Sequence, residues 1–260
     1  MTTEPTSRVV GIGCANTAGY AIYTGADLSG RNEDCRMYSQ HPSLITPPPE
    51  TVSWRYLDFT KFVLLLERNA LFFAKASQLG DPFEGSFEPS TVYEIACKGL
   101  VNPNDLHKAL GESRDQHLVN CRHESDYESA AMWNLYGQVI VIRTTSERLC
   151  QSFECENDIY VGRVTYVDHD TANIIMRSLF NLYRHKRLSF QFEQEVRAIT
   201  VEREVHTANW VGQYYNVDVE WLIERVVVAP NAPDYLYELA PDVVSRYYVH
   251  VQVQKSALGG

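Results

Sequence analysis

The sequence has no long apolar run and no apolar leader. None of its hydrophobic stretches reaches the roughly 18 residues that a membrane-spanning helix requires. The first residues, MTTEPTSR, lack the basic and then apolar order of a secretory signal peptide. These two absences argue against a membrane or secreted protein, so we expect a cytoplasmic protein without a membrane partner.

A surplus of basic residues is also missing. The chain has 23 Lys and Arg against 33 Asp and Glu, which gives a formal net charge of −10. Because binding to a phosphate backbone depends on clustered Lys and Arg, this balance excludes a broad nucleic-acid surface. A local basic patch at Arg184, Lys186 and Arg187 is suited to one phosphorylated small molecule. We therefore expect a small-molecule nucleotide, or a protein acceptor, as the partner.

Paired cysteine motifs are absent too. The six cysteines are scattered, with no C-x-x-C pair and no histidine at a matching spacing, so no zinc or other metal site is predicted. Cys121 stands beside His123, a combination that suggests a thiol nucleophile with its base. We expect the two side chains to point apart on a strand, which would leave the cysteines as reduced, mostly buried small hydrophobic residues.

What the chain does contain is enough apolar sequence for one large core. Of its 260 residues, 45% are hydrophobic and 12% are aromatic. Residues 1–50 carry little periodicity and end in three consecutive prolines. We therefore predict a loosely ordered N-terminal arm over residues 1–50, followed by a globular domain over residues 51–260.

Strand and helix patterns interleave along this domain. Strands are predicted over 52–59, 71–74, 117–123, 139–144, 159–167, 185–203, 225–230 and 247–253. Helices are predicted over 61–68, 91–100, 102–113, 127–136, 145–153, 170–186 and 233–246. Because no regular βαβ alternation is present, we predict an α+β fold, in which helices flank a mixed or largely antiparallel sheet or two apposed sheets.

Local signals place several helix ends. Asp58 or Thr60 is a candidate cap for the helix over 61–68, and Asn102 caps the helix that begins at Pro103. Ser125 or Asp126 is expected to start the helix that Gly137 ends. That helix is predicted to bury four side chains, those of Ala130, Met132, Trp133 and Tyr136.

The most distinctive stretch runs from His185 to Arg203, with the sequence HKRLSFQFEQEVRAITVER. Read as a strand, it places Glu193, Glu195 and Arg197 on one face, about 7 Å apart in succession. Two carboxylates at this spacing are suited to sharing an acid and base task. They are equally suited to flanking an arginine in a solvent-exposed ion-pair ladder.

Four ordered blocks resemble the mainly bacterial family known as domain of unknown function 2971. They are WRYLDFTKFVLLLERNALFFAKASQLGDPFEGS, VNCRHESDYESAAMWNLYG, HKRLSFQFEQEVRAI and LIERVVVAPNAP. The resemblance runs from about Trp54 to the C-terminus. The chain departs from the family pattern in a shortened segment after Tyr136 and in Phe192, where a polar residue is usual. The resemblance implies a fold grouping but no function.

A second likeness is to ADP-ribosyltransferases. Those enzymes carry Arg or His on an early strand, an aromatic residue over nicotinamide, and Glu-x-Glu or a lone Glu on a late strand. Arg55, Tyr56 or Tyr136, and Glu193-x-Glu195 stand here in a compatible order. The resemblance implies that Glu195 stabilises the cation formed when the nicotinamide–ribose bond of NAD breaks. Glu193 would then orient or deprotonate the acceptor, and Arg55 would bind the diphosphate.

Further residues are candidates for binding the ligand. They are Tyr136 or Trp133 for stacking on the ring, Lys186 and Arg187 for neutralising phosphate, and Tyr56, Asp81, Glu84 and Arg197 around the site. Several of them also have a purely structural interpretation. Glu195 with Arg197 fits a surface ion pair worth at most about 1 kcal/mol, Trp133 with Tyr136 fits a packed helix face, and Asp81 with Glu84 fits a turn.

Three functional hypotheses follow. An NAD-consuming transferase or glycohydrolase, of toxin or antiviral-defence type, requires Arg55, Glu195 and an aromatic ring to converge on one cleft. A non-catalytic ligand-sensing or protein-binding module predicts carboxylates that point to solvent and an exposed aromatic patch. A metal-dependent nuclease would place three oxygens about 2 Å from one ion, drawn from Asp81, Glu84, Glu193 and Glu195.

Overall fold

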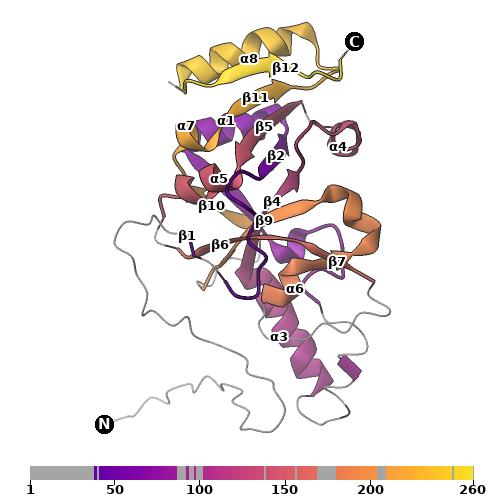
Figure 1. Ribbon diagram of the computed structural model, residues 1–260. Coiled ribbons are helices and arrows are strands. Elements are labelled where there is room, and N and C mark those ends of the chain that lie inside the picture. Colours follow the sequence, from indigo (N-terminus) through magenta and orange to yellow (C-terminus); the bar gives the residue numbers. More distant parts are fainter. Residues whose placement is uncertain are drawn as a thin grey trace, which may run out of the picture.

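The computed structural model describes ten parts of the chain (Figure 1). They are residues 38–39, 41–86, 92–93, 97, 102–137, 139–155, 157–168, 180–203, 209–247 and 249–259. The predicted arm up to residue 37, most of the predicted helix over 91–100 and the segment 169–179 lie outside the described residues. No helix within the described residues is both long and apolar enough to span a membrane.

Twelve strands and nine helical segments lie in the described part of the chain. The strands are β1 Tyr38–Ser39, β2 Val52–Leu57, β3 Ala70–Lys75, β4 His117–Glu124, β5 Ile140–Thr145, β6 Ile159–Arg163, β7 Thr165–Val167, β8 His185–Arg187, β9 Glu195–Val201, β10 Gly212–Asn216, β11 Arg225–Val228 and β12 Gln252–Lys255. The α-helices are α1 Phe59–Arg68, α3 Pro103–Gln116, α4 Ala130–Tyr136, α5 Ser146–Ser152, α6 Phe180–Arg184, α7 Val219–Leu222 and α8 Asp234–Arg246. Two 3₁₀ helices, η1 Ala76–Gln78 and η2 Leu188–Glu193, complete the set.

Ten of the strands form one mixed sheet. Eight of them follow one another in the order β1-β6-β9-β4-β2-β5-β11-β12, and the other two form a branch in which β3 pairs with β4 and β10 pairs with β3. Within it β1–β6 and β11–β12 are parallel pairs, and the other pairs are antiparallel. Strands β7 and β8 form a separate, parallel two-stranded sheet. The predicted α+β class with a largely antiparallel sheet is therefore confirmed. In Figure 1, α8 lies beside β11 and β12 at the top, and α3 lies at the bottom.

Strand β4 shares one of its edges between two neighbours. Along its other edge it pairs continuously with β9, from His117 to His123. On the shared edge, β2 pairs with it only at residues 123–124, and β3 only at residues 118–119. Asn120, Cys121 and Arg122 therefore have no strand beside them on that edge, and the sheet forks there.

The core is divided between the two faces of the sheet. The larger cluster lies on one face, where Phe62 of α1, Leu149 of α5, Leu222 of α7 and Ala240 of α8 pack against the sheet. Two smaller clusters lie on the other face. One is built around Trp54 and Trp133, and the other combines Leu44, Ala76, Val119, Leu182, Tyr183 and Ile199. Leu44 comes from the predicted arm, whose described residues contact the domain, and Ile45 forms a bridge with Arg163 of β6.

Several local predictions are confirmed. The Asp58 side chain accepts from the Lys61 amide at 2.7 Å and caps α1. Asn102 caps α3, with Pro103 at its first position, and Gly137 ends α4 in the left-handed conformation. These signals act within one turn of chain, so they do not depend on the tertiary fold.

Other predictions about α4 are wrong. The helix begins at Ala130 rather than after Ser125 or Asp126, because the Ser129 hydroxyl accepts from the Met132 amide. Met132 and Trp133 are buried as predicted, but Ala130 and Tyr136 are exposed. The shorter helix buries only Met132 and Trp133, and the residues at its two ends are exposed to solvent.

Four further points of the predicted secondary structure need correction. The run 159–167 breaks into β6 and β7 at Val164, whose amide donates to the Glu195 carbonyl. Residues 212–216, for which no strand was predicted, form β10 against β3, and the last strand begins at Gln252 rather than at residue 247. Lys186 lies on β8 and not in a helix. In each case pairing with a distant strand decided the outcome, which the local pattern does not contain.

Gly212 provides a test of the pairing between β3 and β10. A Cβ at Gly212 would lie 2.1 Å from the Phe73 carbonyl oxygen of the paired strand, whereas a Cβ at exposed Gly111 of α3 would meet nothing within 4 Å. We expect Gly212→Ala to lower the free energy of unfolding by about 2–4 kcal/mol. Gly111→Ala, the control, should raise it by about 0.5–1 kcal/mol. Urea unfolding of both variants measures the difference, and equal stabilities would contradict the β3–β10 register.

Candidate functional site

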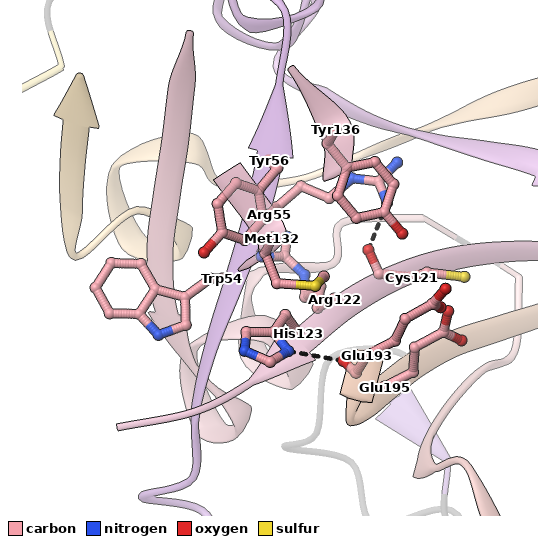
Figure 2. A pocket seen from close by; sticks show the side chains of 10 residues that line it. All are labelled: Trp54, Arg55, Tyr56, Cys121, Arg122, His123, Met132, Tyr136, Glu193 and Glu195. Atoms are coloured by element: carbon pink, nitrogen blue, oxygen red, sulfur yellow. Dashed lines mark hydrogen bonds between the residues drawn. The ribbon is translucent and has the colours of Figure 1, made fainter. Parts of the chain in front are cut away.

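A cavity of about 60 Å³ lies at the fork between β2 and β4 (Figure 2). Its lining comes from four elements and the short helix η2. The residues are Trp54, Arg55 and Tyr56 of β2, Cys121, Arg122 and His123 of β4, Met132 and Tyr136 of α4, Glu193 of η2, and Glu195 of β9.

The register explains why both faces of the sheet reach this cavity. Trp54 pairs with His123, and His123 pairs with Glu195, so these three side chains share a face. Arg55 and Arg122 are the next residues on their strands and start from the opposite face. Because β2 and β4 separate beyond the Trp54–His123 pair, the Arg55 guanidinium turns into the gap. There it donates a hydrogen bond to the Cys121 carbonyl, drawn as a dashed line in Figure 2.

The backbone conformation that brings Glu193 and Glu195 to the cavity differs from the predicted single strand. The stretch from His185 to Arg203 is not one strand, because η2 and a left-handed Gln194 (φ 39°) separate β8 from β9. Glu193 therefore ends a 3₁₀ turn instead of sharing a strand with Glu195. The turn folds back on the strand, and Figure 2 shows the two carboxyl groups side by side. Phe192 is 51% exposed on η2.

A buried network of charges holds these two glutamates. The Lys186 ammonium lies 2.5 Å from Glu193, 3.0 Å from Glu195 and 3.2 Å from Glu84. Arg197 contacts Glu195 at 2.5 Å and Glu84 at 2.7 Å. All five side chains are at most 8% exposed. The Glu195–Arg197 pair is therefore not the solvated surface pair that the sequence also allowed.

The network pushes the pKa values of the two glutamates apart. Burial raises the pKa of Glu193 to about 7, and the hydrogen bond and charge of Glu195 act in the same direction, against Lys186. Burial alone would raise the pKa of Glu195 as well, but the charge of Arg197, the hydrogen bond from Glu193 and the charge of Lys186 outweigh it and lower this pKa. Glu195 is thus an ionised carboxylate at neutral pH, and Glu193 is able to gain or lose a proton there.

The Cys121 thiol lies beside these carboxylates. Burial and the negative charge of Glu195 raise its pKa to about 12, so the thiol stays protonated. Cys121 and His123 line the same cavity, so the expectation that they point apart was wrong: residues two apart on a strand share a face. His123 donates from Nδ1 to the Glu193 carbonyl at 2.7 Å. The prediction that Cys121 is unreactive is consistent with its raised pKa.

Aromatic side chains close the cavity on the α4 side. The rings of Tyr56 and Tyr136 are stacked, with centroids 6.2 Å apart, and Tyr136 is 42% exposed. Burial raises the pKa of Tyr136, and the charges of Glu193 and Glu195 raise it further. Trp133, the other stacking candidate, does not line the cavity. It packs in the core against Tyr56 and donates to Glu128.

The structure thus brings five of the eleven predicted site residues together at the cavity. Arg55, Tyr56, Tyr136, Glu193 and Glu195 line the cavity. Glu84, Lys186 and Arg197 lie behind it and fix the two glutamates in place. Asp81 and Arg187 lie apart from it as a separate ion pair at 2.9 Å. Asp81 also accepts from the Phe83 amide, which confirms its role as a turn former.

Arg122 is the lining residue that sequence reasoning missed most clearly. Trp54 was also missed, and Met132 was predicted only as a buried side chain of its helix. A signal was present, because NCRHE is an unusually polar run for a strand that the pattern places inside the domain. Such a run indicates a central strand with polar groups on both faces, which is typical of a site rather than of a core.

The carboxylates are not arranged to hold a metal ion. Within the described residues, no group of three or more His, Cys, Asp or Glu side chains is placed to do so. The Lys186 ammonium occupies the centre of Glu84, Glu193 and Glu195, where a cation would otherwise sit. The nuclease hypothesis needs three carboxylate oxygens around one ion, and this geometry speaks against it.

Lys186 provides a stability test of the network. Lys186→Met leaves Glu193 without its cation, and leaves Glu84 and Glu195 with Arg197 alone, in a buried site. We therefore expect it to lower the free energy of unfolding by about 3–5 kcal/mol at pH 7. The carboxylates that lose their cation acquire raised pKa values in the folded state. Their protonation then favours folding, and the deficit shrinks as the pH falls.

The matched control is Lys108→Met on α3, where the lysine is exposed and 3.9 Å from Glu112. This variant should change stability by no more than about 0.5 kcal/mol at any pH. Denaturant unfolding of both variants between pH 4 and 8 makes the comparison. A deficit for Lys186→Met that does not depend on pH would contradict the charge network.

Glu193 provides a second test, through the pH dependence of stability. Its pKa in the folded state, about 7, lies above the ordinary value of 4.5. Its protonated form therefore contributes stability that is complete below pH 4.5 and is lost as the pH rises through 7. The pKa of Glu195 is lowered, so its contribution is lost only at more acidic pH and does not overlap this window.

We expect the stability of the wild-type protein to fall from pH 5 to pH 8 relative to that of Glu193→Gln, which has no titrating group at this position. Glu238→Gln, an exposed change on α8, serves as the control and should track the wild type. Parallel unfolding titrations at pH 5, 6, 7 and 8 measure both differences. A constant gap between wild type and Glu193→Gln would mean that Glu193 keeps an ordinary pKa.

Comparisons with known proteins add no family to this picture. No protein-family model, no curated protein and no solved structure matches the chain. The resemblances to domain of unknown function 2971 and to ADP-ribosyltransferases have no support from these comparisons and stay predictions from the sequence. A functional proposal therefore depends on the geometry of the cavity.

Proposed function

We propose that the protein is an NAD-consuming enzyme that breaks the nicotinamide–ribose bond, as an ADP-ribosyltransferase or a glycohydrolase does. The observation that carries the proposal is the convergence of Arg55, Glu195 and the Tyr136 ring on one cavity. This was the geometrical requirement that the sequence set for such an enzyme. We also propose, on the sequence alone, that it acts in the cytoplasm.

The two glutamates divide the chemistry between them. When the bond between ribose C1′ and the nicotinamide nitrogen breaks, its electron pair leaves with nicotinamide and a cation develops on the ribose. The ionised Glu195, buried and held by Lys186 and Arg197, stabilises that cation where water screens little. Glu193, with its pKa raised to about 7, accepts the proton of the incoming hydroxyl. An acceptor on a protein gives a transferase, and water gives a glycohydrolase.

The size of the cavity limits which part of NAD it receives. A volume of about 60 Å³ accommodates on the order of five water molecules and not a dinucleotide. We expect the half-exposed Tyr136 ring to move aside so that the nicotinamide end enters, and then to stack on it. The adenosine end of the dinucleotide would lie outside the fork.

The alternative of a non-catalytic sensing or protein-binding module fits the site less well. It predicts carboxylates that point to solvent, but Glu193 and Glu195 are only 5% and 6% exposed. Holding two buried acids beside each other destabilises a fold, and a surface that only binds a protein has no need of them. The pair is better explained by proton transfer and charge stabilisation.

The decisive experiment is incubation of the purified protein with NAD and measurement of released nicotinamide. We expect the wild type to release it and Glu195→Gln to lower the rate at least about 100-fold, because the cation loses its counter-charge. Glu238→Gln, with the same chemical change on the exposed face of α8, should keep the wild-type rate.

Thermal unfolding of each variant separates loss of activity from loss of fold. Attachment of ADP-ribose to protein, as opposed to its release, distinguishes the transferase from the glycohydrolase. Absence of nicotinamide release by the folded wild-type protein would disprove the proposal, and so would a folded Glu195→Gln that retains the full rate.

A further inference from the structure

Arg122 is a buried cation without a partner. Its side chain is 2% exposed, and none of its three guanidinium nitrogens has a hydrogen-bond partner in the described part of the protein. Burial lowers its pKa to about 9, and the charge of Arg55 lowers it further in the same direction. The guanidinium therefore remains protonated at neutral pH.

Arg197 shows how this fold satisfies a buried arginine elsewhere. It lies on the adjacent strand β9 and is 1% exposed, yet its guanidinium donates to Glu195, Glu84 and the Tyr183 carbonyl. Leaving a guanidinium buried and unpaired costs several kcal/mol. The contrast between Arg197 and Arg122 indicates that Arg122 takes a partner that the described residues do not supply.

The position of Arg122 indicates where that partner binds. Arg122 and Arg55 follow the last pair of the β2–β4 ladder, so both side chains begin on the same face at the open fork, and both line the cavity. Arg55 donates to the Cys121 carbonyl, which fixes its guanidinium in the gap. The charge of Arg55 disfavours the charged form of Arg122. An anion between the two guanidinium groups turns this repulsion into two attractions.

We propose that the fork between β2 and β4 binds one compact oxyanion of the phosphate type, held between the guanidinium groups of Arg122 and Arg55. The surrounding charges allow it. Among the described residues, the cavity and the network behind it hold the four cations Arg55, Arg122, Lys186 and Arg197 and the three carboxylates Glu84, Glu193 and Glu195. The cavity volume of about 60 Å³ suits one such group. Bidentate contact with phosphate is the geometry that guanidinium groups prefer.

The inference goes beyond the cleavage of NAD. It assigns a role to Arg122, and it holds for any ligand that carries such an anionic group, whether or not a bond is broken. If the protein releases no nicotinamide, the fork can still bind the anion. If the fork binds no anion, Glu193 and Glu195 can still cleave NAD. The two proposals therefore fail separately.

The test is the thermal stability of the full-length protein in inorganic phosphate, compared with sodium chloride of equal ionic strength. A ligand bound only by the folded state raises Tm with its concentration. At a phosphate concentration 100-fold above Kd, we expect a rise in Tm of about 5–10 °C over chloride. A wild-type Tm that is the same in both salts would overturn the inference.

Arg122→Met and a control, Arg246→Met on the exposed face of α8, locate the site. In phosphate-free buffer we expect Arg122→Met to unfold at the wild-type temperature or above it, because the change removes an unpaired buried charge. It should also lose the phosphate response, which Arg246→Met should keep. A lower Tm without phosphate would show that Arg122 is satisfied within the chain, and a full phosphate response in Arg122→Met would place the anion elsewhere; either result overturns the proposal.

Arg55→Met tests the site independently of Arg122, because it removes the other guanidinium group. It should raise the Kd for phosphate at least about 10-fold.

ADP-ribose identifies the source of the anion. If it competes with inorganic phosphate, the site holds a phosphate group of a larger ligand. If inorganic phosphate binds and ADP-ribose does not compete, the site holds the free anion.

Discussion

The structure depends on one constraint: a single edge of β4 is shared by two strands that cannot both follow it to the end. Strand β2 pairs at residues 123–124 and β3 at residues 118–119, so the sheet divides between them. Unpaired backbone inside a protein must find other partners, and here side chains provide them. Arg55 donates to the Cys121 carbonyl and Asn120 donates to the Phe72 carbonyl, so the fork is held open by polar contacts.

Behind the fork, the charge network holds the side chains of Glu193 and Glu195 in place. Lys186 contacts three carboxylates, and Arg197 joins two of the same three. Burial makes each of these contacts strong and makes the removal of any one member costly. The network also gives the two glutamates different proton affinities, although they are the same residue type and lie side by side. Position within the network therefore decides which acid is ionised.

The cavity consequently presents opposite charges from opposite faces of the sheet. Glu193 and Glu195 approach from the face that carries Trp54 and His123, and the two arginines approach from the other. A ligand that carries an anionic group next to a centre where positive charge develops matches this arrangement. NAD has both features, which links the oxyanion site to the proposed reaction without making either depend on the other.

The sequence by itself determined the local structure. The α1 and α3 caps, the end of α4 at Gly137 and the α+β class follow from hydrogen bonds and periodicity within a few residues. It also named Arg55, Glu193 and Glu195 as candidates, because their residue types and order are those of a known chemistry. The placement of Glu193 on a 3₁₀ turn, the burial of Glu195 with Arg197, and the unpaired Arg122 depended on tertiary structure. Only the pairing of strands far apart in the sequence decides which edge is left open and which charges meet there.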